Sequence, residues 1–138
     1  MNEIEKQILE EYVDKFSIAA KSYELMGKML DEKFVKERLD MFHIGDAYIY
    51  GGTYMASQLY RVAKKYINIM GVVDKVGKML TSEDVKVLTL EDLRKCYDGE
   101  QVIVTPIRFY SQIKNDLIRF VDNKNIVLIG ELFEGIAE

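Results

Sequence analysis

The 138-residue sequence contains few of the residues that build disulfides or metal sites. It has one cysteine, one histidine, one proline and no tryptophan. A lone cysteine forms no internal disulfide, and one histidine with one cysteine cannot supply a zinc cage. We expect Cys96 to be a small buried hydrophobe on a short helix. No metal site is predicted.

Long apolar runs and an excess of positive charge are also missing. The longest apolar runs, such as residues 126–130, are far shorter than the roughly 18 residues of a membrane span, and the acidic N-terminal region does not resemble a secretory signal. Nineteen basic and twenty-three acidic residues leave a net charge of −4. We therefore expect a cytoplasmic protein with no membrane span and no nucleic-acid partner.

What is present is the composition of a folded domain, with 49% hydrophobic and 30% charged residues. Apolar side chains recur every three to five positions through the first forty residues, which predicts helices over residues 2–26 and 31–41, with a break at Gly27 or at the polar patch Asp31-Glu32-Lys33. We take residues 1–44 as an N-terminal helical segment. This segment either packs on the rest of the chain, forms a homodimer, or docks on a larger enzyme.

Strands and helices alternate over residues 45–138. Strands are predicted at 47–50, 67–73, 85–88, 101–104 and 125–129, and helices at 54–66, 90–97 and 107–121. Near-continuous apolar strands joined by helices predict an α/β fold with a doubly wound parallel sheet. Right-handed crossovers favour the strand order 3-2-1-4-5, which places a binding crevice beyond the carboxyl ends of the first and fourth strands.

The strongest local motif lies between the first predicted strand and its helix, and it reads Gly51-Gly52-Thr53-Tyr54-Met55-Ala56. It has the outline of the dinucleotide fingerprint G-x-G-x-x-G/A, with Thr53 in place of the middle glycine. The turn predicts free backbone N–H groups for a phosphate at a helix N-terminus, and Asp74 after the next strand is suited to ribose hydroxyls. The alternative is a structural turn without a ligand.

Thr105, Pro106 and Arg108 follow the fourth predicted strand and form the expected opposite wall of the crevice. Thr105 before a proline predicts a helix N-cap, with a contact between its hydroxyl and a ligand as the alternative. Arg108 either pairs with a phosphate or is simply solvated.

Four segments carry a resemblance to a known family: Tyr48-Ile49-Tyr50-Gly51-Gly52, Met70-Gly71-Val72-Val73-Asp74-Lys75, Leu90-Glu91-Asp92-Leu93 and Val102-Ile103-Val104-Thr105-Pro106. Residues 46–130 resemble the Rossmann-like nucleotide-sugar-binding domains of bacterial surface-polysaccharide biosynthesis enzymes, as found in sugar acyltransferases and sugar-nucleotide dehydratases. The resemblance implies binding of a nucleoside diphosphate sugar or of NAD(P), with Gly51, Gly52 and Asp74 in the matching positions.

Together these features predict a nucleotide or nucleotide-sugar binding module, accessory to polysaccharide or sugar-nucleotide metabolism. Too few residues follow the last strand for a second catalytic half, so we do not expect a complete enzyme in this chain alone. One alternative is a non-catalytic interaction protein, in which a degenerate scaffold self-associates through the N-terminal helices. Another is a small enzyme completed across a dimer interface.

Overall fold

The structure, a computed structural model, describes residues 2–51, 54–74 and 85–135. Five parallel strands form one sheet in the order β3-β2-β1-β4-β5. The strands are β1 (Asp46–Tyr50), β2 (Asn68–Val73), β3 (Val87–Leu88), β4 (Gln101–Val104) and β5 (Ile126–Leu128). The predicted α/β class, the parallel sheet and the strand order are confirmed.

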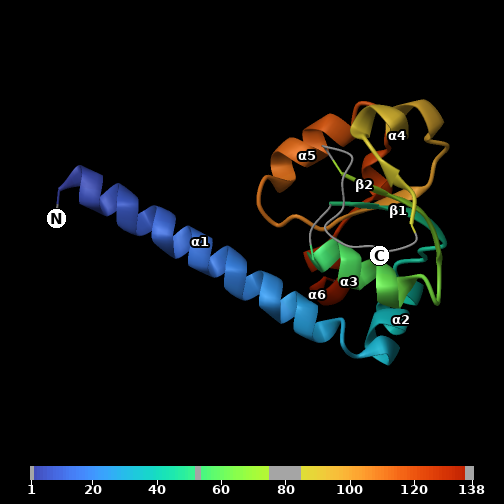
Figure 1. The fold of residues 1–138 in the computed structure, drawn as a ribbon, viewed down its shortest axis with the longest axis horizontal. Coiled ribbons are helices and arrows are strands. Elements are labelled where there is room, and N and C mark those ends of the chain that lie inside the picture. Colours follow the sequence, from blue (N-terminus) through green and yellow to red (C-terminus); the bar gives the residue numbers. More distant parts are fainter. Residues whose placement is uncertain (1, 52–53, 75–84, 136–138) are drawn as a thin grey trace.

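Helices cover both faces of this sheet (Figure 1). They are α1 (Glu3–Lys28), α2 (Glu32–Met41), α3 (Tyr54–Ala63), α4 (Leu90–Cys96), α5 (Tyr110–Leu117) and α6 (Ile129–Glu134), with a short 3₁₀ turn at Asn123–Asn125. Helices α4 and α5 lie on one face, and α2, α3 and α6 lie on the other. Successive strand side chains point to opposite faces, so β1 contributes Ala47 and Ile49 to one core and Tyr48 and Tyr50 to the second.

Short-range capping signals place several helix starts. The Asn2 side chain accepts a hydrogen bond from the Glu5 N–H at 2.8 Å at the start of α1. Thr89 and Asp92 form a reciprocal capping box at the start of α4.

Both predicted N-terminal helices are present, but Gly27 lies inside α1 and the break comes at residues 29–31. Within the described residues, no helix combines the length and the apolar character needed to cross a bilayer.

The helix expected over residues 107–121 is shorter, because α5 runs from Tyr110 to Leu117. The prediction that Thr105 caps it is wrong. The Thr105 N–H and hydroxyl both donate to the Tyr50 carbonyl, at 3.0 and 2.9 Å, and so extend the pairing of β4 with β1. The chain then turns, and Phe109 precedes α5 in the left-handed region with φ +64°.

Two further expectations are corrected at the C-terminal end and at the cysteine. The strand predicted over residues 125–129 is shorter, because β5 ends at Leu128 and Ile129 begins α6 with Gly130 in its first turn. Burial of Ile129, Leu132 and Phe133 in the core outweighs the low helix propensity of one glycine. Cys96 is exposed rather than buried.

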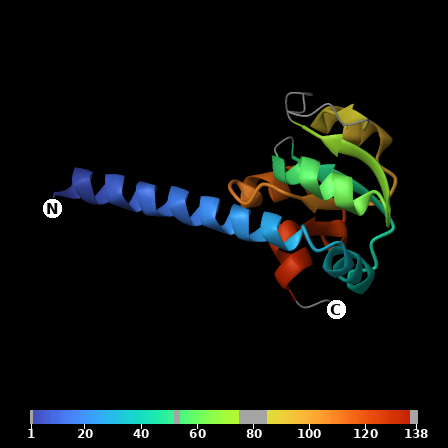
Figure 2. The same ribbon diagram turned by 60° about the horizontal axis from the view of Figure 1, so that its bottom comes forward.

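Helix α1 has one anchored end and one projecting end. Near its C-terminus, Leu25 and Met29 are fully buried in the core, and Lys21 and Lys28 both pair with Glu134 of α6. The rest of the helix extends away from the sheet domain in both views (Figures 1 and 2). Among the residues that the structure describes, the N-terminal segment therefore shares a core with the sheet through its second half.

Replacing Glu134 tests this anchor by its pH dependence. Hydrogen bonds from Lys21 and Lys28 lower the pKa of Glu134 from 4.5 to about 2. A lowered folded-state pKa contributes stability that is present above pH 4.5 and lost as the pH falls toward 2. In urea denaturation, Glu134→Gln should therefore change stability little at neutral pH, where exposed ion pairs contribute weakly, and should reduce the loss on acidification.

The matched control for this experiment is Glu37→Gln, on the exposed side of α2. It should retain the wild-type acid profile. If Glu134→Gln also retained that profile, the two lysine contacts would not hold α1 on α6.

Candidate functional site

A cavity of about 420 Å³ opens beyond the carboxyl ends of β1 and β2, beside the loop that follows β4. The strand order reverses between β1 and β4, which is the place where open parallel sheets bind ligands. The lining residues are Tyr50, Gly51, Val73, Asp74, Pro106, Arg108, Phe109, Gln112, Ile113 and Asp116. Three predicted site residues, Gly51, Asp74 and Arg108, are therefore brought together from three separate segments.

Gly51 forms the edge of the cavity at the end of β1. Its N–H donates to the Val73 carbonyl at 2.8 Å, and its φ of +131° lies in a region that side-chain-bearing residues rarely adopt. A Cβ built here would lie 2.2 Å from the Thr105 hydroxyl oxygen and 3.2 Å from Pro106 Cδ. Glycine is required at this position because the loop after β4 packs directly against it.

The cavity carries two carboxylates, Asp74 at the end of β2 and Asp116 on α5, together with one guanidinium, Arg108, among apolar side chains. Burial raises the pKa of Tyr50, and the charges of Asp116 and Asp74 raise it further. The phenol therefore stays protonated and is available as a hydrogen-bond donor. Carboxylates beside a neutral phenol suit a ligand rich in hydroxyl groups.

One side of α5 supplies a wall that the sequence analysis missed. Phe109, Gln112, Ile113 and Asp116 follow the spacing of one helical face. Phe109 is 64% exposed, and the Arg108 guanidinium lies 5.1 Å from the centre of its ring. In the sequence, this wall is indicated by Gln112 and Asp116. The two polar residues are four positions apart, so they lie on one side of the helix together with Ile113.

The remaining predicted site residues lie elsewhere. Tyr54 is exposed at the start of α3 and does not line the cavity, and Met55 is buried in the core beneath α3. Thr105 is buried, and its hydroxyl is directed to the Tyr50 carbonyl. Gly52 and Thr53 lie outside the described residues, so the phosphate contact predicted for them stays a prediction.

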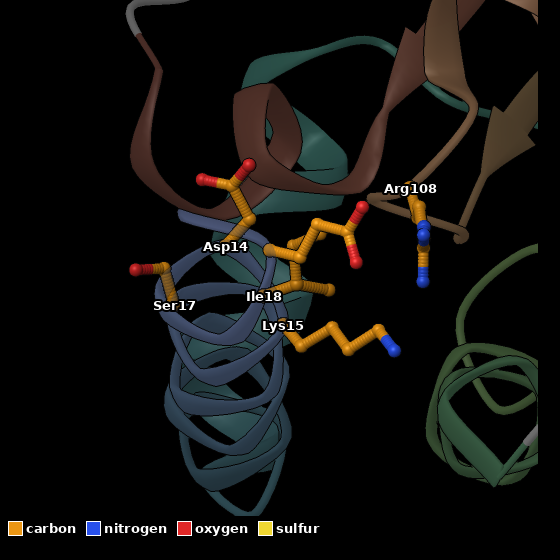
Figure 3. A pocket seen from close by; sticks show the side chains of 6 residues that line it. Asp14, Lys15, Ser17, Ile18 and Arg108 are labelled. Atoms are coloured by element: carbon orange, nitrogen blue, oxygen red, sulfur yellow. The ribbon is translucent and has the colours of Figure 1, made fainter. Parts of the chain in front are cut away.

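Arg108 also borders a second hollow of about 460 Å³, between the loop after β4 and α1. Figure 3 shows Arg108 across this hollow from Asp14, Lys15, Ser17 and Ile18. Glu11 completes the lining. The same guanidinium therefore borders both the crevice and the acidic middle of α1.

Comparisons of this chain with protein-family models, with curated proteins and with solved structures find no match. Over residues 2–51, 54–74 and 85–135, no three His, Cys, Asp or Glu side chains gather in a way that would hold a metal ion.

Proposed function

We propose that this protein is a binding module for a nucleotide or a nucleotide sugar, and that it assists polysaccharide or sugar-nucleotide metabolism. The observation that carries the proposal is the cavity at the topological switch point, with Gly51, Asp74 and Arg108 on its walls. The resemblance of residues 46–130 to nucleotide-sugar-binding domains supports the same ligand class.

The chemistry of the walls suggests how such a ligand is held. Asp74 and Asp116 accept hydrogen bonds from ribose or sugar hydroxyls, and the exposed ring of Phe109 offers a surface for stacking a base. Phosphate is assigned to the N-terminus of α3, where helix N–H groups favour anions, with Arg108 as a second contact. The two carboxylates make the crevice better suited to the sugar portions than to an isolated pyrophosphate.

A thermal-shift and calorimetry panel tests this assignment. UDP-glucose, GDP-mannose, NAD and NADP are compared with uridine, glucose and inorganic pyrophosphate. We expect at least one intact nucleotide or nucleotide sugar to raise the melting temperature more than its separate parts, because only the intact ligand spans both the carboxylates and the α3 N-terminus.

No response to any intact compound would overturn the proposal. That result would favour the alternative from the sequence, a scaffold that acts only through protein contacts. A response to pyrophosphate alone, unaffected by changes at Asp74, would place the anion site elsewhere on the protein.

A further inference from the structure

We propose that two copies of this chain associate through α1, with the two helices antiparallel. The surface concerned is the α1 stripe, which we define as Leu9, Tyr12, Phe16, Ala19 and Tyr23. Tyr12, Phe16 and Tyr23 are 75%, 74% and 75% exposed. Ile8 and Val13, beside the stripe, are also more than half exposed.

The spacing of the α1 stripe is that of a coiled-coil seam. Its members are separated alternately by three and four residues, which is the a and d pattern of the heptad repeat. A helix that turns such a seam to water lacks the packing from which protein helices gain most of their stability. We therefore expect a second apolar surface to pack on the stripe.

The described part of this chain does not cover the α1 stripe. Helix α1 contacts the sheet domain through Leu25, Met26 and the partly buried Lys21 and Ser22. At 3.6 residues per turn, Leu25 and Lys21 lie on the side of the helix away from the stripe, whereas Ser22 and Met26 border it. Most of the stripe lies in the portion that projects beyond the domain (Figure 2). The anchor to α6 is made by Lys21, Lys28 and Glu134, which are not members of the stripe.

Charge along α1 favours a second copy in the antiparallel direction. Residues 3–14 contain five acidic residues and one basic residue, whereas residues 15–28 contain three lysines and one glutamate. Antiparallel pairing sets the acidic half of each helix against the basic half of the other, while parallel pairing sets acidic halves together. Lys21 and Lys28 already pair with Glu24 and Glu134 of the same chain, so the positive half contributes chiefly through Lys15, and the main effect of the antiparallel direction is to keep the two acidic halves apart.

Side-chain sizes select one antiparallel register. In antiparallel coiled coils an a position faces a d position of the other helix. The facing pairs across the two copies are then Tyr12 with Tyr23 and Phe16 with Ala19, and Leu9 comes beside Met26, which already packs against the core of its own chain. At the centre of the seam the bulky Phe16 meets the small Ala19, which lets the helices approach closely.

The size of this contact is sufficient for a specific dimer. Such interfaces bury about 1,200–2,000 Å² in total, and a buried aromatic ring contributes roughly 150–250 Å². Tyr12, Phe16 and Tyr23 from both copies supply most of that area, and Ile8, Leu9 and Val13 add to it. A lipid surface is disfavoured, because the projecting half of α1 is acidic and anionic headgroups would repel it.

Sedimentation equilibrium on the full chain tests the association. We expect a mass of twice the 16.0 kDa chain that falls toward the monomer on dilution. Phe16→Glu should weaken the dimer by roughly a hundredfold, because it buries a charge at the centre of the seam. Phe16 is 74% exposed, so the monomer should keep its fold, as checked by circular dichroism.

The control for this variant is Ile118→Glu, an exposed apolar residue at the end of α5, which should leave the dimer intact. A monomeric wild-type chain would overturn the proposal. A dimer equally unaffected by Phe16→Glu and Ile118→Glu would also overturn it. So would a monomer that binds vesicles of anionic phospholipid through α1.

Disulfide trapping in a Cys96→Ser background tests the direction of the helices. Val13 and Ala20 flank the seam and face one another across the antiparallel pair, so a mixture of Val13→Cys and Ala20→Cys chains should form a mixed disulfide dimer on mild oxidation. Ala19→Cys alone should crosslink poorly. Efficient Ala19→Cys crosslinking without the mixed product would indicate parallel helices and refute the antiparallel arrangement.

Discussion

Gly51→Ala should lower the free energy of unfolding by roughly 2–5 kcal/mol, which combines backbone strain with overpacking. The φ of +131° is strained for alanine, and the new Cβ would lie 2.2 Å from the Thr105 hydroxyl oxygen. Thr105 cannot move away freely, because its N–H and hydroxyl both bind the Tyr50 carbonyl. Urea denaturation at neutral pH measures the effect.

Two other glycines allow the effect of backbone strain to be measured separately from that of overpacking. Gly99 has φ +93° but open space around its Cβ position, so Gly99→Ala should cost only the backbone strain, about 1–3 kcal/mol. Gly45 has neither a positive φ nor a neighbour within 4 Å, and Gly45→Ala should lie within about 1 kcal/mol of the wild type. Equal denaturation midpoints for Gly51→Ala and Gly45→Ala would contradict the close approach of the two strand ends.

Asp74→Ala should weaken binding of the responding nucleotide by roughly 10–150-fold. This range corresponds to the loss of a charge-assisted hydrogen bond, about 1.5–3 kcal/mol. Asp74 lines the cavity beside Tyr50 and Gly51, and its own N–H binds the Leu88 carbonyl at 2.9 Å, so the backbone position should survive the substitution. Isothermal titration calorimetry measures the affinity, and circular dichroism checks the fold.

The control for Asp74→Ala is Asp40→Ala, which removes an exposed carboxylate from α2 and does not alter the cavity lining. It should keep the wild-type affinity despite the same change in net charge. If both variants bound equally well, the carboxylate at the end of β2 would have no role in holding the ligand, and the crevice assignment would fail.

Much of the fold was predictable because its signals are local. Strands buried on both faces read as continuous apolar runs, and the crossover rule then leaves few strand orders. Thr89 satisfies the start of α4 from within three residues, so the sequence alone locates that cap. Thr105 has the same local appearance, yet its partner is the Tyr50 carbonyl, 55 residues earlier in the chain. No short-range pattern distinguishes the two threonines.

Residues of the candidate site were likewise predictable where the signal is local and not where it depends on distant contacts. Gly51 and Asp74 were found because each directly follows an apolar strand, and a parallel sheet brings such positions to one edge. Phe109 and Asp116 were missed, because the start of α5 and the side it turns to the crevice depend on where the loop after β4 is held. The Thr105–Tyr50 hydrogen bonds decide this.

By itself the sequence determined an α/β chain with a parallel sheet, the order of its strands, and a glycine turn followed one strand later by an aspartate. Those features depend on hydrophobic periodicity and on the handedness of short crossovers, which act over neighbouring residues. Only the tertiary structure decided which side of α5 lines the cavity and that the apolar side of α1 is left uncovered. Both depend on contacts between residues distant in the chain, where burial and hydrogen bonding outweigh local preference.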